Sequence, residues 1–99
     1  MSARTLHLPR LVAGRDYADD LVRSLVLEPG AEVLVDGSGL LSGTPSFAAE
    51  LVQRILVDGK ARSLRLVGAP GEFTGYAETA AKDLDVQDRF QAAAHLSPA

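Results

Sequence analysis

The chain of 99 residues contains no cysteine and no tryptophan, and aromatic residues make up only 5% of it. Without cysteine there is no disulfide, no thiolate ligand for zinc and no thiol nucleophile. The fold must therefore rest on a hydrophobic core, and apolar residues, at 46% of the chain, are numerous enough to form one. A chain without disulfides suits a reducing compartment, so we expect a cytoplasmic protein.

Clustered positive charge and long apolar runs are missing as well. The 10 basic and 13 acidic residues give a net charge of −3, and the basic ones are scattered, whereas nucleic-acid-binding surfaces gather lysine and arginine. No apolar run approaches the roughly 20 residues that span a bilayer, and the opening MSARTLHLPR lacks the apolar stretch of a signal peptide. We therefore expect neither a nucleic-acid partner nor a membrane partner.

Short runs of aliphatic and β-branched residues indicate the strands. Two of them, Glu32–Asp36 and Ser63–Val67, are bounded by glycine or proline and predict buried strands. Residues 5–8 predict a weaker strand, which Pro9 confines to an edge or an end of the sheet.

Apolar residues at helical spacing predict four helices, at residues 16–27, 45–57, 72–83 and 86–96. The first should bury Leu21, Val22, Leu25 and Val26, and the second should expose Ser46, Glu50, Gln53 and Arg54. This order predicts a small α/β domain over residues 1–99, with a short mixed or parallel sheet of about three to four strands and about four helices. We expect residues 96–99 to form a short flexible tail.

The second helix has a clear start signal. Thr44 is a candidate N-cap, because its hydroxyl can accept a hydrogen bond from a free amide of the first turn. Pro45 suits the first helical position, since it has no amide to satisfy. Ser46 then occupies the second position, near the positive end of the helix. Its plain interpretation is a solvated first-turn serine.

The loop before this helix contains Gly37, Gly39 and Gly43, between a predicted strand and a predicted helix. Phosphate-binding loops share that context. The spacing here is G-x-G-x-x-x-G, which is not the dinucleotide-binding pattern, and the loop has no lysine. The simpler interpretation, which we prefer, is that these glycines permit tight turns. Asp36 is expected to cap the turn that follows it.

No arrangement typical of an enzyme is found. His7 and His95 lie at opposite ends of the chain, so no histidine is obviously placed to serve a nucleophilic serine. The acidic residues Asp16, Asp19 and Asp20 suit the first turns of a helix, where carboxylates are favoured, more than a magnesium site. We expect a protein that is not an enzyme and that needs no cofactor or metal.

A family resemblance arises in the run VLVDGSGLLSGTPSFAAELVQRIL, residues 33–56. It is similar to the central segment of the STAS superfamily, and most closely to STAS-like domains, in which a strand ending in Asp leads through a Ser-Gly turn to a helix that opens with Ser-Phe-Ala. The run KDLDVQDRF, residues 82–90, is similar to the closing segment of the family.

In the classical members, the anti-sigma factor antagonists, a serine at the start of this helix is phosphorylated by a partner serine kinase, which is itself the anti-sigma factor. The resemblance places Ser46 on this phosphoacceptor, with Thr44, on the family's acidic position, as the other candidate. The sequence departs from the family pattern at Thr44, at Gly37, and at Phe47, where the classical members have glycine. Phe47 is typical of the STAS-like branch.

The resemblance implies a non-enzymatic regulatory domain for signalling and transcription regulation, which binds a histidine-kinase-type ATPase acting as an anti-sigma factor or serine kinase. The expected partner-binding residues are Ser38, Gly39, Gly43, Thr44, Ser46, Glu50 and Gln53. The alternative is a sensor of a small ligand or nucleotide, which would use residues 37–46 and the helix N-terminus as an anion site.

Overall fold

The computed structural model describes residues 3–93. Its strands are β1 (Ala3–His7), β2 (Leu11–Val12), β3 (Glu32–Asp36), β4 (Ser42–Gly43), β5 (Ser63–Val67) and β6 (Phe90–Ala93). Its helices are α1 (Arg15–Arg23), α2 (Pro45–Val52) and α3 (Gly71–Asp83), with the π-helical turn η1 (Gln53–Asp58) and the 3-10 turn η2 (Gln87–Arg89). The tail expected at 96–99 and His95 lie outside the described residues.

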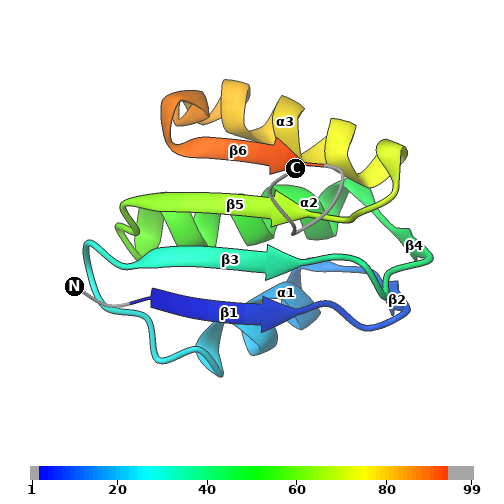
Figure 1. Ribbon diagram of the computed structural model, residues 1–99, viewed down its shortest axis with the longest axis horizontal. Helices are drawn as coiled ribbons and strands as arrows, with labels where there is room; N and C mark the ends of the chain where they lie inside the picture. Colours follow the sequence, from blue (N-terminus) through cyan, green and yellow to red (C-terminus); the bar gives the residue numbers. More distant parts are fainter. Residues whose placement is uncertain (1–2, 94–99) are drawn as a thin grey trace.

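Four strands form one parallel sheet in the order β1-β3-β5-β6. The α-helices lie on one face of this sheet (Figure 1), and that face carries the buried aliphatic residues Leu6, Val33, Val35, Leu64 and Leu66. No helix within residues 3–93 covers the other face, where Thr5, His7 and Arg65 are exposed. Alternation along each strand accounts for this separation of apolar and polar residues. The predicted α/β fold is confirmed, with β1 at an edge.

A second, two-stranded parallel sheet was not expected from the sequence. It pairs β2 with β4, so that Leu11 lies beside Ser42 and Val12 beside Gly43. We call it the β2–β4 ribbon; it lies past the carboxyl ends of β1 and β3 (Figure 1). A Cβ atom on Gly43 would lie 2.6 Å from Cδ1 of Phe73, so only glycine lets the ribbon pack this closely on α3. The ribbon is therefore fixed to the core.

The first helix is shorter than predicted. It ends at Arg23, and the Ser24 hydroxyl donates to the Leu21 carbonyl at 2.6 Å just past that end. Val26 adopts a left-handed conformation with φ of 49° and is 74% exposed, so its predicted place in the core is wrong. The predicted burial of Val22 and Leu25 is confirmed.

The second helix starts as predicted at Pro45 but widens after Val52 into η1. The guanidinium of Arg89 stabilises the end of this turn, because it donates to the carbonyls of Leu56 at 2.9 Å and Ala61 at 2.7 Å. Arg89 comes from η2, at the other end of the sequence. This link attaches the C-terminal segment to α2 and η1.

The helix predicted at residues 86–96 is wrong over its described part. The chain forms η2 and then β6, which pairs with β5 so that Phe90 lies beside Leu64 and Ala93 beside Val67. Alanine-rich sequence favours a helix, but β5 offers an unpaired edge, and hydrogen bonds to that edge outweigh the local preference. The described residues thus contain three α-helices where the sequence predicted about four.

Candidate functional site

The N-termini of α1 and α2 meet at Thr44. Its Oγ1 accepts a hydrogen bond from the Phe47 amide at 3.2 Å, which confirms Thr44 as the N-cap of α2. The same oxygen accepts from the amide of Gly14, the residue before α1, at 3.4 Å. The Thr44 amide donates to the carbonyl of Val12 on β2 at 3.2 Å. One threonine therefore connects both helices to the β2–β4 ribbon.

Ser46 is a partly exposed residue in the first turn of α2, as predicted. Its hydroxyl oxygen lies 3.2 Å from Thr44 Oγ1, and either group can be the donor. The two candidate phosphoacceptors are thus in direct contact. They are not equivalent, because the Thr44 oxygen is occupied by the cap, whereas the Ser46 hydroxyl forms no other hydrogen bond within residues 3–93.

Substituting Thr44 by alanine should lower the free energy of unfolding by about 1–2 kcal/mol, because the amides of Phe47 and Gly14 lose their acceptor. Thr44→Ser keeps the hydroxyl and is the matched control, expected to remain within about 0.5 kcal/mol of the original protein. Urea unfolding followed by circular dichroism measures both. Equal stability of the alanine and serine variants would show that the cap contributes nothing.

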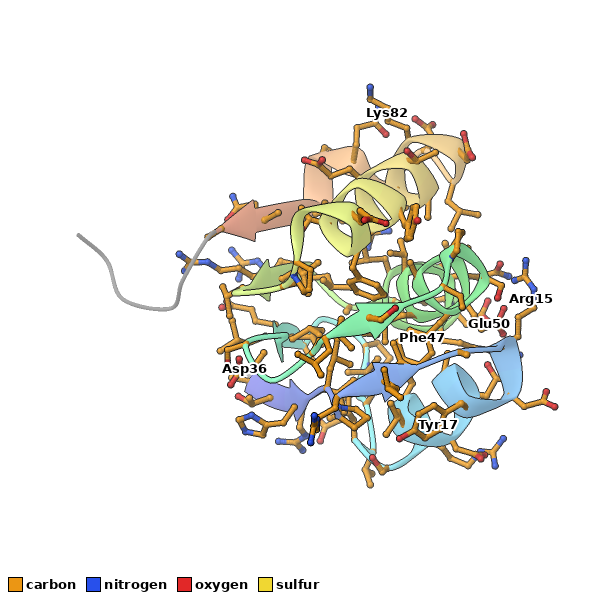
Figure 2. All side chains as sticks on the ribbon, turned by 90° about the vertical axis from the view of Figure 1, so that its right-hand side faces the viewer. Arg15, Tyr17, Asp36, Phe47, Glu50 and Lys82 are labelled. Atoms are coloured by element: carbon orange, nitrogen blue, oxygen red, sulfur yellow. The ribbon has the colours of Figure 1, made fainter. Side chains whose placement is uncertain are left out.

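Glu50 is not part of an exposed stripe. It is 7% exposed, so the prediction that it faces solvent is wrong. One carboxylate oxygen binds Arg15 of α1 at 2.9 Å and the other binds Arg54 at 2.9 Å. Arg54 continues the network to Asp19 of α1 at 2.7 Å and to Asp58 at 3.0 Å. Figure 2 shows Arg15 and Glu50 side by side where α1 meets α2.

The network explains why a carboxylate is tolerated between two helices. Both oxygens of Glu50 have a charged donor, and the carboxylates of Asp19 and Glu50 raise the pKa of Arg54. Asp19, expected only to favour the helix start, is therefore an interhelical partner. Gln53, another predicted contact residue, lies in η1 and is partly buried.

The residues after β3 form a separate hydrogen-bonded group around Asp36. The Ser38 amide donates to Asp36 Oδ1 at 3.0 Å, which confirms the predicted capping of this turn. Hydrogen bonds from the Ser38 backbone and hydroxyl, and then from His7, lower the pKa of Asp36. Figure 2 places Asp36 far from Arg15 and Glu50.

Since Glu50 is buried, the predicted contact residues do not all belong to an exposed surface. Gly43, Thr44 and Ser46 lie together at the start of α2. Ser38 and Gly39 are exposed in the preceding loop, and within residues 3–93 neither forms a hydrogen bond with Ser46.

Packing explains two of the loop glycines without a ligand. A Cβ atom on Gly37 would lie 2.8 Å from that of Ala69, and one on Gly43 would overlap the Phe73 ring. Close approach of neighbouring segments thus requires glycine at both positions. Nothing in this packing favours the anion-site alternative.

Two exposed leucines were missed by the sequence analysis. Leu11, in β2, is 66% exposed. Leu41, the residue directly before β4, is 62% exposed. The adjacent Leu40 is 4% exposed. The sequence around these leucines has no periodic pattern that separates buried from exposed positions. Only the pairing of β2 with β4 leaves Leu11 and Leu41 exposed while Leu40 is buried.

Within residues 3–93, no group of three or more histidine, cysteine, aspartate or glutamate residues is arranged to hold a metal ion. None of the helices described is both long and apolar enough to cross a bilayer. Comparison with protein-family models, with curated proteins and with solved structures finds no match to this chain.

Proposed function

We propose that this protein is a non-enzymatic regulatory interaction domain, similar to anti-sigma factor antagonists, that binds a cytoplasmic histidine-kinase-type ATPase or serine kinase. The observation that carries the proposal is the start of α2, where partly exposed Ser46 lies beside a fixed ribbon that presents Leu11 to solvent. The sequence resemblance at residues 33–56 supports the same assignment.

An apolar side chain on a rigid ribbon suits protein recognition. Leu11 extends from a strand that is bonded to the α2 cap through the carbonyl of Val12. A partner that covers Leu11 gains from the burial of apolar surface, and little ordering is required because the ribbon is already fixed. The partner surface therefore comprises Leu11, Gly43, Thr44 and Ser46, and it omits Glu50.

Ser46 is the better phosphoacceptor of the two candidates. Phosphorylation of Thr44 would remove the acceptor of two backbone amides, whereas the Ser46 hydroxyl contacts only Thr44 in the described part of the chain. A phosphate on Ser46 would add about −1.5 to −2 charges near the positive end of α2, which the helix tolerates. Arg15, which binds Glu50 one turn farther along, is a nearby compensating charge.

The same phosphate should disrupt the complex. A doubly negative group brought into a packed interface loses its hydration and repels acidic neighbours, so the partner dissociates while the fold survives. Phosphorylation thus acts as a switch on binding and leaves folding stability nearly unchanged.

Ser46→Asp and Leu11→Asp should each weaken binding of the captured ATPase at least about tenfold, with little change in melting temperature. The experiment is affinity capture from cells that express the protein, with mass spectrometry of the partners and of Ser46, followed by titration of the purified partner. Thr79→Asp, at an exposed position of α3, is the matched control for added charge.

Capture of an ATPase of the histidine-kinase type by the original protein and by Thr79→Asp, but not by Ser46→Asp, would support the proposal. Equal binding by all variants, together with a Ser46 that is never phosphorylated, would leave this serine as a helix-start residue and reject the switch.

A further inference from the structure

The guanidinium of Arg15 uses only part of its hydrogen-bonding capacity. Its Nη1 donates to Glu50 Oε1 at 2.9 Å (Figure 2), and this is the only hydrogen bond of the Arg15 side chain within residues 3–93. A guanidinium carries five N–H donors in a planar fork, so the other donors have no protein acceptor in this part of the chain. The side chain is also 58% exposed. Arg15 is therefore a cation with unused donors at the point where α1 meets α2.

The hydroxyl of Ser46 lies close to this arginine. Ser46 and Glu50 are four residues apart in α2, so their side chains are neighbours on one face of the helix, and Glu50 is the residue that Arg15 binds. The amide of Gly14, the residue before Arg15, donates to Thr44 Oγ1 at 3.4 Å. The same oxygen lies 3.2 Å from Ser46 Oγ. The backbone before Arg15 and the end of its side chain thus both lie beside the first two turns of α2.

A phosphate on Ser46 would have a negative neighbour in Glu50. Like charges four residues apart on a helix repel each other, and the repulsion is stronger here because Glu50 is 7% exposed and buried charges are screened less by water. Arginine suits phosphate well, since its planar fork can make two parallel N–H···O bonds to the phosphate oxygens. The other oxygen of Glu50 keeps Arg54 at 2.9 Å. A cation that contacts both the phosphate and Glu50 would remove the repulsion.

We propose that Arg15 is the residue that binds the phosphate of Ser46, with its unused donors on the phosphate and Nη1 on Glu50. The inference rests on the proposed function, because it begins with a phosphorylated Ser46. In that step Ser46 Oγ forms a bond to the γ-phosphorus of ATP, ADP leaves, and the hydroxyl proton passes to a base of the kinase. Arg15 then lies between two negative groups and connects the phosphate to α1. It is the reason that the fold tolerates the modification.

Phosphoserine placed at position 46 during synthesis, by a suppressor tRNA, tests the proposal on the purified chain without a kinase. In the original protein, phosphorylation should change the melting temperature by less than about 2 °C. In Arg15→Gln, phosphorylation should lower it by at least about 3 °C, because no cation separates the phosphate from Glu50. Each phosphorylated chain is compared with its own unphosphorylated form, so the loss of the pair between Arg15 and Glu50 cancels.

The phosphorus NMR signal of the phosphoserine provides a measurement that a purely structural role of Arg15 would not change. A bound arginine favours the dianionic form of the phosphate. Arg15→Gln should therefore raise the pKa of the phosphoserine by at least about 0.5 relative to the original protein. Arg15→Lys keeps the charge without the planar fork, so its phosphoserine pKa should lie between the two.

Arg23→Gln is the matched control, because it removes an exposed arginine from the last turn of the same helix. It should respond to phosphorylation like the original protein in both measurements. An equal response of Arg15→Gln and Arg23→Gln would overturn the proposal. So would a phosphoserine pKa that is the same in the original protein and in Arg15→Gln.

This proposal and the proposed function can fail separately. The phosphate is installed without a kinase, so failure to capture a partner from cells does not alter the two measurements on the purified chain. Conversely, a phosphate that does not contact Arg15 leaves capture of the partner by the unphosphorylated protein unaffected.

Discussion

Phe47→Ala is expected to lower the free energy of unfolding by about 3–5 kcal/mol, the largest effect of any substitution considered for this chain. Phe47 is fully buried, and its ring lies between two others, 5.9 Å from the Tyr17 centroid and 6.0 Å from the Phe73 centroid. The substitution removes the ring contacts of α2 with α1 and with α3, and it leaves a cavity in the closely packed helical layer.

Urea unfolding measures this loss, and two variants calibrate it. Phe47→Leu keeps much of the volume and should cost about 1–2 kcal/mol. Tyr17→Ala removes a ring that is 38% exposed and should cost less than Phe47→Ala. A loss below about 1 kcal/mol for Phe47→Ala would mean that the three rings do not form the centre of the helical layer.

The position of Phe47 also bears on the site. It follows Ser46 directly, and its amide donates to Thr44 Oγ1. The buried ring and the cap together fix the first turn of α2. A phosphate on Ser46 would therefore act on a partner while this turn keeps its shape.

Glu50→Ala should lower the free energy of unfolding by about 2–3 kcal/mol. Removal of one member of a buried ion pair costs about 3–5 kcal/mol, and we reduce this figure because Arg15 and Arg54 are about half exposed and regain water. The side chain of Glu50 links α1 to α2 through both arginines. Its loss should loosen α1 first.

One further substitution separates the charge of Glu50 from its volume, and another, at Glu78, is the control. Glu50→Gln keeps the shape and one acceptor, so it should lie between alanine and the original protein. Glu78→Ala, at an exposed position of α3, should change stability by less than about 0.5 kcal/mol. If Glu50→Ala is as stable as Glu78→Ala, the ion pairs of Glu50 contribute nothing to the stability of the fold.

Most of the fold could be predicted because strong local patterns agree with tertiary burial. Glu32–Asp36 and Ser63–Val67 are strands in the structure, and α3 has nearly its predicted bounds. Thr44, Pro45 and Asp36 perform their predicted local roles, since caps and turns involve groups only a few residues apart. These features needed no knowledge of the rest of the chain.

Two of the failures involve partners distant in sequence. Val86–Phe90 has a helical pattern, yet Phe90 pairs with Leu64 on β5. Glu50 is polar and sits on the polar side of its helix, yet Arg15, from another helix, makes its burial tolerable. The predicted exposed stripe through Ser46, Glu50 and Gln53 is therefore interrupted at Glu50.

The sequence by itself determined the class of the fold, the alternation of strands and helices, and the start of α2 at Thr44, because these depend on periodicity and on hydrogen bonds between near neighbours. Only the tertiary structure decided that Glu50 of α2 is buried, that β2 and β4 form a ribbon, and that Leu11 and Leu41 stay exposed. Burial and charge pairing depend on which surfaces folding brings together. The sequence of a single helix or loop does not indicate which neighbouring element will cover it.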